Sequence, residues 1–339
     1  MLMWGNSRLH CCLKLGPHEA AWAESSRNWW GQRRDRYRLT QLPPGLIQPS
    51  PVEPNITDLA ALTTRLRALV KPEARGRSAV HRVMAQVPRP MALIVPDLCV
   101  RAVIFRLDNV PTRSAEREAL IRWRLGQEKL FPLVGAKVVS QPLSTNGKQM
   151  AGPQTVLAVA IQEAILHQYE AACEAVGLAP MQVDVVSFRL FNLWAKATQG
   201  ARRKGAEDLL WLSLLDGGLT FLIFHAGQLV FLRSKLQLPG ARFADESSRL
   251  EAERADKVVA EIAASLLSCA ETHPDLAAKR LILVTDELQP ELARQLSEEF
   301  GVEVEELGLA QAEYAGWSSD DASVPRSVLP AIAGLLGGG

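Results

Sequence analysis

Apolar and polar positions alternate in blocks most regularly just beyond the middle of the chain. Three apolar runs follow one another there, at 209–215, 219–224 and 229–232. The separators Asp216-Gly217-Gly218 and 225–228 contain the glycines that tight hairpin turns need for their positive φ angles, so the pattern predicts three antiparallel strands. Because the runs are apolar almost throughout, we expect both faces of the sheet to be covered, most simply by helices.

A weaker copy of this pattern opens the chain. Three short candidate strands lie at 9–15, 20–24 and 37–42. A Pro-rich link then leads into a helix whose leucines recur with a helical period between residues 59 and 69. Strands followed by helix therefore occur twice, and the second half continues as β-β-β-α-β-α-β. We expect two related α/β domains, residues 1–204 and 205–339, with the boundary in the polar and basic segment 198–205.

A smaller β-rich piece is predicted inside the first domain. Four strand-like runs lie there, at 91–95, 100–107, 137–142 and 155–161. Ser114 is placed to cap a helix between them, and a clear amphipathic helix follows the last run and stops at Gly177. We expect a small inserted subdomain at 88–161.

Composition narrows the range of partners. The 38 basic and 37 acidic side chains nearly cancel, which leaves no global field to draw the protein to nucleic acid. The five cysteines are odd in number and mostly scattered, so we expect buried thiols in a reducing cytoplasm. No run approaches the ~18 apolar residues of a membrane span. We expect a soluble, cytoplasmic protein that meets its partner through a local groove.

Other candidate sites are weaker. The six histidines never pair at the i, i+4 spacing of a helical metal site, and Ser213 lacks the glycines of a nucleophile elbow. The basic run Arg33 to Arg38 could touch phosphate or a membrane surface, but a solvated edge strand is the commoner explanation. Trp29-Trp30 is either folded onto the core or exposed as a partner anchor.

The order of elements resembles the actin-like ATPase fold, with its duplicated ribonuclease-H-like domains. Within that fold it is similar to the PilM family of type IV pilus assembly proteins. The stretches that carry this resemblance are LIVPD at 93–97, IRWRLGQEKLFP at 121–132, YEAACEAVGLAPMQVD at 169–184 and GQLVFLR at 227–233. They cover nearly the whole chain in order, although the first 35 residues match poorly.

The resemblance implies a nucleotide site in which two hairpin loops clamp the phosphates. Each loop usually carries an Asp-x-Gly that orients Mg²⁺ and the attacking water. In the first loop Lys14 stands where that Asp should be, two residues before Gly16. In the second, aligning Gly218 and Thr220 with the family's Gly-x-Thr puts Leu214 at the Asp position. Both carboxylates that the chemistry needs are therefore replaced.

A third family element, whose glycines receive the adenosine, reads Asp286-Glu287 in this chain. The resemblance thus assigns a degenerate nucleotide pocket, composed of Gly16, Asp216, Gly217, Gly218, Thr220 and Asp286. Losing one preorganised group costs roughly 10²-fold or more in rate, so we expect a pseudo-ATPase without catalytic residues, metal or required cofactor. Weak binding of ATP and Mg²⁺ through backbone N–H groups stays open, as does the interpretation of residues 216–218 as a plain hairpin turn.

The function that the resemblance implies is that of an adaptor. In the family, the N-terminal cytoplasmic tail of a bitopic inner-membrane protein, PilN, lies in a groove that would involve residues near 93–161 of this chain. Such a protein is peripheral to the inner membrane through its partner, and the pilus motor ATPase is a second expected contact. Two alternatives remain: a working actin-like ATPase or small-molecule kinase, and the cytoplasmic part of a type II secretion L-type protein, which is weakened because no transmembrane helix follows.

Overall fold

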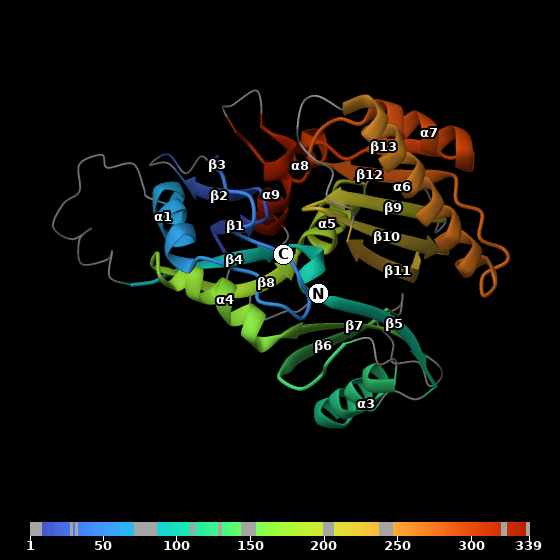
Figure 1. The fold of residues 1–339 in the computed structure, drawn as a ribbon, viewed down its shortest axis with the longest axis horizontal. Helices are drawn as coiled ribbons and strands as arrows, with labels where there is room; N and C mark the ends of the chain where they lie inside the picture. Colours follow the sequence, from blue (N-terminus) through green and yellow to red (C-terminus); the bar gives the residue numbers. More distant parts are fainter. Residues whose placement is uncertain are drawn as a thin grey trace.

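Two five-stranded sheets stand side by side, with a smaller three-stranded sheet below them (Figure 1). The computed structural model describes residues 9–27, 30, 33–70, 87–108, 111, 113–127, 131–143, 154–198, 207–236, 247–319 and 324–336. In this part of the chain, no helix combines the length and the apolar character that crossing a bilayer requires.

The first sheet has the strand order β3-β2-β1-β4-β8. Its members are β1 (Cys11–Leu15), β2 (Glu19–Arg27), β3 (Arg33–Gln41), β4 (Arg89–Val95) and β8 (Leu178–Val185). The first three form the predicted antiparallel meander, whereas β1, β4 and β8 run parallel. Helices α1 (Leu59–Val70) and α4 (Glu163–Glu174) cover one face over a shared apolar cluster. Gly177 ends the α4 segment at a φ of 78°, as the sequence predicts.

The second sheet repeats this arrangement with the order β11-β10-β9-β12-β13. Its members are β9 (Leu209–Leu215), β10 (Gly218–His225), β11 (Gln228–Leu236), β12 (Arg280–Thr285) and β13 (Glu303–Glu306). The predicted hairpins are present, and Asp216 and Gly217 take φ angles of 54° and 75° in the first turn, which suits a tight two-residue hairpin turn. Helices α6 (Ser247–Ala270) and α7 (Pro290–Phe300) cover one face.

Three helices fill the space between the two sheets, so the prediction that both faces are covered is confirmed. They are α5 (Val186–Thr198), α8 (Leu309–Tyr314) and α9 (Leu329–Leu336). Phe191 of α5 stacks on Phe224 of the second sheet, with ring centroids 4.4 Å apart. The wholly buried α9 packs on β1, β2 and β4, although it follows the second sheet in sequence. A Cβ at Gly334 would lie 2.4 Å from Cys12 Sγ, so only glycine allows this close approach.

The predicted division at residue 204 separates the strands but not the helices. The described strands of the first sheet and of the three-stranded sheet all precede residue 204, and those of the second sheet all follow it. Helix α9, however, follows the second sheet in sequence and packs against the first.

The three-stranded sheet has the order β5-β7-β6 and carries one helix. Its elements are β5 (Arg101–Leu107), α3 (Ser114–Gln127), β6 (Ala136–Pro142) and β7 (Gln154–Gln162). The predicted inserted subdomain at 88–161 also includes β4, which instead pairs with β1 and β8. The reason is that residues 91–95 are buried and apolar on both faces, as a central parallel strand requires. The inserted sheet therefore begins at Arg101, after the short 3₁₀ helix η1 (Asp97–Cys99).

The five cysteines are buried free thiols, as predicted. Burial raises the pKa of Cys11 to about 11 and the pKa of Cys99 and Cys173 to about 12. Such thiols are almost entirely protonated at neutral pH, which makes them poor nucleophiles.

Candidate functional site

The carboxyl end of β1 and the turn that follows β9 meet at the junction of the two sheets, where a buried ion pair joins them. Lys14 Nζ lies 2.7 Å from Asp216 Oδ1, and the two side chains are only 2% and 6% exposed. Glu19 adds a second carboxylate at 3.8 Å from the same nitrogen. Two residues that are 202 positions apart in sequence are thus locked together at the predicted nucleotide pocket.

Gly16 shows how little space remains beside this pair. A Cβ at Gly16 would stand 2.3 Å from Asp216 Oδ1 and 2.6 Å from Lys14 Nζ. No side chain fits there without displacing the ion pair. The space between the two loops, where the resemblance expects phosphate, is therefore occupied by an ammonium and a carboxylate of the protein itself.

The charges around Lys14 decide its protonation state. Burial alone lowers the pKa of Lys14, but Asp216, Asp286 and Glu19 outweigh it, so the pKa lies above its usual value. Asp286, from the third predicted element, thus acts on the same site through its charge. Asp216 Oδ2 is buried and has no hydrogen-bond partner among the described residues. Lys14 is consequently a fixed cation held among acidic groups.

A second buried junction was missed by the sequence analysis, which used Asp97 only as part of a family stretch. Asp97 Oδ1 accepts a hydrogen bond of 2.9 Å from the backbone N–H of Ser187, in the first turn of α5. Its Oδ2 accepts one of 2.9 Å from Thr220 Oγ1 on β10, and another from Ser187 Oγ. Thr220 Oγ1 in turn lies 3.1 Å from Ser234 Oγ on β11. The usable signal was a Pro-Asp at the carboxyl end of a buried parallel strand, where α/β sheets place ligand-facing groups.

The remaining predicted residues divide between these junctions. Gly217 is exposed in the turn, and Gly218 faces η1, since a Cβ there would lie 3.1 Å from Leu98 Cγ. Leu214 packs against the apolar cluster beneath α6 and α7, on the face of the sheet opposite that of Trp211 and Leu215. The position that the resemblance assigns to the second carboxylate therefore points away from the ion pair.

Replacing Asp97 by alanine is expected to lower the free energy of unfolding by about 2 kcal/mol, because hydrogen-bond donors of Ser187 and Thr220 lose their acceptor. Urea unfolding measures the change. Asp97→Asn keeps an acceptor for Ser187 and is expected to cost less than half as much. Equal losses in the two variants would contradict the hydrogen-bonding role.

The difference in stability between wild type and Asp97→Asn should depend on pH in a defined direction. Burial raises the pKa of Asp97, against the hydrogen bonds of Ser187 and Thr220, which lower it. A raised pKa in the folded state means that folding favours the protonated carboxyl. The stability of wild type relative to Asp97→Asn should therefore increase as the pH falls through the folded-state pKa.

An open groove lies next to the Asp97 junction. It has a volume of about 310 Å³ and is lined by Pro49, Ser50, Pro51, Leu98, Val100, Arg101, Ala102, Ser234, Lys235 and Leu236. We call it the η1 groove. β5 and β11 are edge strands of their sheets and pack beside each other here. Only Leu98 to Ala102 fall within the predicted range 93–161, and the other two walls come from the 49–51 loop and from β11.

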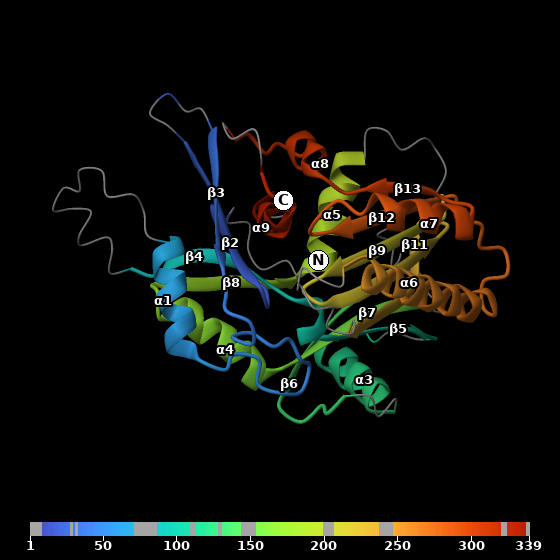
Figure 2. The same ribbon diagram turned by 45° about the horizontal axis from the view of Figure 1, so that its top comes forward.

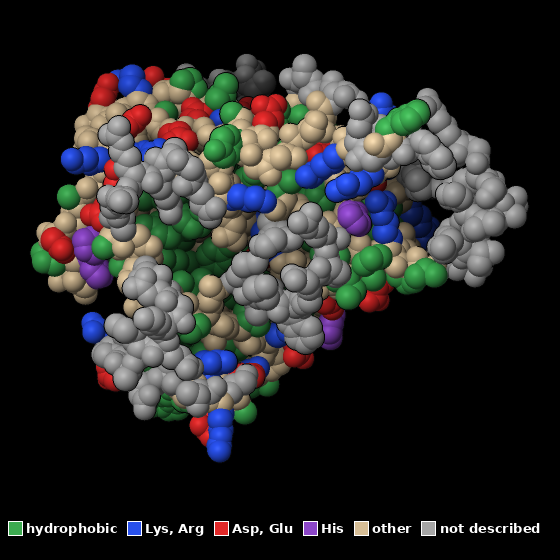
Figure 3. Space-filling model, turned by 180° about the vertical axis from the view of Figure 1, so that it is seen from behind, with side chains coloured by type: hydrophobic (Ala, Val, Ile, Leu, Met, Phe, Trp, Pro, Cys, Tyr) green, Lys and Arg blue, Asp and Glu red, His purple; other side chains and the backbone are tan. Residues whose placement is uncertain are grey.

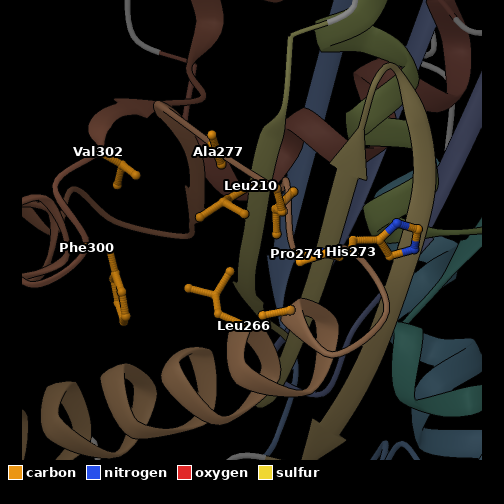
Figure 4. A pocket seen from close by; sticks show the side chains of 10 residues that line it. Leu210, Leu266, His273, Pro274, Ala277, Phe300 and Val302 are labelled. Carbon is orange, nitrogen blue, oxygen red and sulfur yellow. The ribbon is translucent and has the colours of Figure 1, made fainter.

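A second cavity, of about 270 Å³, lies on the outer side of the second sheet. Leu210, Leu266, Phe300 and Val302 line it with apolar surface, and His273 stands at one end (Figure 4). It is walled by α6 and by the segments around α7, away from the ion pair. No element of the first sheet contributes to it.

Comparison with known proteins supports the fold. No protein-family model and no curated protein matches this sequence. Among solved structures, a chain of a PilM-PilN type IV pilus biogenesis complex is similar, with a TM-score of 0.72 and 19% sequence identity over 98% of this chain and 99% of that one. The predicted actin-like ATPase fold is confirmed.

Two more distant structures share 90% coverage of this chain. One is a protein with an actin-like ATPase fold and unknown function from Bacteroides thetaiotaomicron, with a TM-score of 0.48, 10% identity and 94% coverage of that chain. The other is the cytoplasmic domain of EpsL, an inner membrane component of the type II secretion system of Vibrio cholerae, with a TM-score of 0.44, 12% identity and 93% coverage.

Proposed function

We propose that this protein is a cytoplasmic assembly adaptor of a type IV pilus machine that binds the N-terminal tail of a PilN-like inner-membrane protein and does not hydrolyse ATP. The observation that carries the proposal is the buried ion pair between Lys14 and Asp216. It lies between the two loops that, by the resemblance to the actin-like ATPase fold, would clamp phosphate. The likeness to a chain of the PilM-PilN complex over nearly the full length supports the pilus machine as its setting.

The ion pair argues against nucleotide turnover in two ways. A triphosphate would have to separate Lys14 from Asp216, and breaking a buried pair costs about 3–5 kcal/mol. Mg²⁺ also needs oxygen ligands on both loops, yet one position is Lys14 and the other is Leu214, which faces the α6 side. Neither position therefore supplies an oxygen ligand, and the neighbouring carboxylates of Asp216, Glu19 and Asp286 face the Lys14 cation instead.

The η1 groove supports the adaptor role. Extended peptides are held by main-chain hydrogen bonds and a few apolar pockets, and the groove offers apolar side chains together with edge strand β5. Arg101 Nε is buried there without a hydrogen-bond partner among the described residues. A carbonyl or carboxylate of a bound peptide would satisfy it. The expected ligand is an extended, largely apolar segment with an acceptor placed at Arg101.

The groove is also connected to the predicted nucleotide pocket. Leu98 lines the groove and packs against Gly218, and Ser234 is linked through Thr220 to Asp97. The ion pair between Lys14 and Asp216 holds these walls in one arrangement, so we expect partner binding that does not depend on nucleotide.

Titration with MgATP tests the absence of catalysis. We expect no heat of binding below millimolar nucleotide by calorimetry, since a penalty of about 3–5 kcal/mol corresponds to roughly a 150- to 5,000-fold loss of affinity. We also expect no phosphate release above the rate of buffer. Tight Mg²⁺-dependent binding or measurable hydrolysis would favour the alternative of a working ATPase or kinase.

Coprecipitation tests the partner. The N-terminal cytoplasmic segment of a PilN-like protein, fused to a soluble carrier, should retain the full chain on resin, whereas the carrier alone should not. No retention at high micromolar concentration would count against the adaptor role, whatever the nucleotide result.

A further inference from the structure

The hairpin of β2 and β3 extends beyond the first sheet as a two-stranded ribbon. β1 pairs with β2 only as far as Glu24, whereas the pairing of β2 with β3 continues to Arg27 opposite Arg33. Figure 2 shows this ribbon projecting from the body of the molecule. β3 is the edge strand of the sheet, which confirms the predicted solvated edge but leaves its unusual side chains unexplained.

The exposed charge of the ribbon is entirely positive. Its four exposed arginines are Arg27, Arg33, Arg34 and Arg36. Arg27 lies directly opposite Arg33, and like charges in such a pair destabilise a hairpin. Because side chains alternate along a strand, this pair lies on one face of the ribbon, whereas Arg34 and Arg36 lie on the other. Figure 3 shows Lys and Arg side chains gathered over the region of β2 and β3.

Two carboxylates among the described residues, Asp35 and Glu24, offset only part of this charge. Asp35 is buried and binds Arg33 Nε at 2.7 Å and the backbone N–H of Ser318 at 2.9 Å. Glu24 is engaged by Arg38 and Arg89 at the base of the ribbon. In a chain of net charge +1, the ribbon is therefore a local concentration of cations.

A tryptophan stands at the tip of this cationic ribbon. Trp30 lies in the turn between the two strands and is 83% exposed, whereas Trp29 lies outside the described residues. Fully buried tryptophans are the rule in the cores of this protein, as at Trp22 and Trp211. An indole held out in water beside guanidinium groups has the chemistry of a membrane interface, where Trp sits at headgroup depth and Arg binds lipid phosphate.

We propose that the β2–β3 ribbon docks this protein on an anionic lipid bilayer, with Trp30 entering the headgroup region and the four arginines contacting lipid phosphates. When the tip of a narrow ribbon enters the headgroup layer, anionic headgroups lie on both sides of it, so arginines on both faces can contact lipid phosphates. These arginines suit a single nucleic acid strand less well, since one strand would reach the cations of one face only. The ribbon and the η1 groove share no residue, so this inference does not depend on the proposed peptide partner.

Vesicle flotation with the full chain tests the inference. At low salt, the protein should float with vesicles of phosphatidylcholine containing 30% phosphatidylglycerol, about fivefold more tightly for each engaged arginine, and should not float with phosphatidylcholine alone. Binding should disappear in 0.5 M salt because the Debye length then falls to roughly 4 Å. Arg34→Glu with Arg36→Glu should weaken binding at least 25-fold, and Trp30→Ala should weaken it severalfold.

Matched variants on α3 and at the residue that precedes it supply the control. Arg113→Glu with Arg124→Glu makes the same change in net charge on another surface, and Trp123, which is 60% exposed, can be replaced by alanine in the same way. Both control variants should float like wild type, and all variants should still be retained by the partner peptide. Equal losses in ribbon and α3 variants, wild-type binding that ignores lipid charge, or tighter binding to a short single-stranded oligonucleotide than to the anionic vesicles would overturn the proposal.

Discussion

Replacing Lys14 by methionine is expected to lower the free energy of unfolding by about 3–5 kcal/mol, the usual cost of leaving one member of a buried ion pair uncompensated. The cost arises because Asp216, Glu19 and Asp286 would then face one another without the cation that they surround. Urea unfolding followed by tryptophan fluorescence measures the shift, since Trp211 lies in the core between the sheets.

Two further variants make this prediction specific. Adding Asp216→Asn to Lys14→Met removes the carboxylate that lies nearest to the lost cation, and Asn tolerates the positive φ of 54° at this turn position, so much of the stability should return. Lys235→Met removes another ion-paired lysine, whose side chain is 57% exposed, and should cost less than about 1 kcal/mol. Equal losses in the single and double Lys14 variants would show that the pair is not a unit.

Filling the η1 groove is expected to abolish partner binding. Ala102→Trp places an indole in the space lined by Leu98 and Val100, and blocking a central pocket should weaken peptide affinity by about 100-fold or more. Ala278→Trp makes the same change in the outer cavity of the second sheet and should leave affinity unchanged. Fluorescence anisotropy of a labelled partner peptide compares the two variants.

A subtler change probes the same groove through a hydrogen bond. Arg101→Met keeps much of the side-chain length but removes the buried Nε donor, and affinity should fall by roughly tenfold. If Ala102→Trp and Ala278→Trp bind the peptide equally well, the peptide site lies elsewhere.

Local pattern predicts much of this fold. The apolar runs at 209–215 and 219–224 become β9 and β10 with the expected turn between them, and Gly177 stops its helix in the left-handed region. These features depend on neighbours in sequence, since period, turn chemistry and capping act over a few residues. Most of the helices and strands can therefore be predicted from the sequence without knowledge of their arrangement.

The arrangement itself depends on contacts between distant residues. Lys14 departs from the Asp that the resemblance expects in the first loop, but its partner Asp216 is 202 positions away, and no local rule pairs them. The packing of α9 on the first sheet and the bonds of Asp97 to Ser187 and Thr220 are of the same kind. Each depends on how the two sheets close on each other, which propensity and periodicity do not encode.

The inserted subdomain shows how one strand can mislead. Residues 91–95 and 101–107 are consecutive strands, which favours pairing them as a hairpin, yet η1 turns the chain between them and β4 joins the first sheet. The buried apolar character of β4 on both faces was the available signal. This apolar character places β4 in the centre of the first sheet, although β5 follows it directly in sequence, because a strand of that composition needs cover on both sides.

The proposed function requires a partner site that works without nucleotide. The most direct test is titration of the full chain with the N-terminal peptide of a PilN-like protein, by calorimetry, in the absence and presence of millimolar MgATP. We expect saturable binding with the same affinity in both conditions, because the ion pair of Lys14 and Asp216 already fixes the loops beside the groove. Binding that requires MgATP, or no binding at high micromolar peptide, would contradict the account.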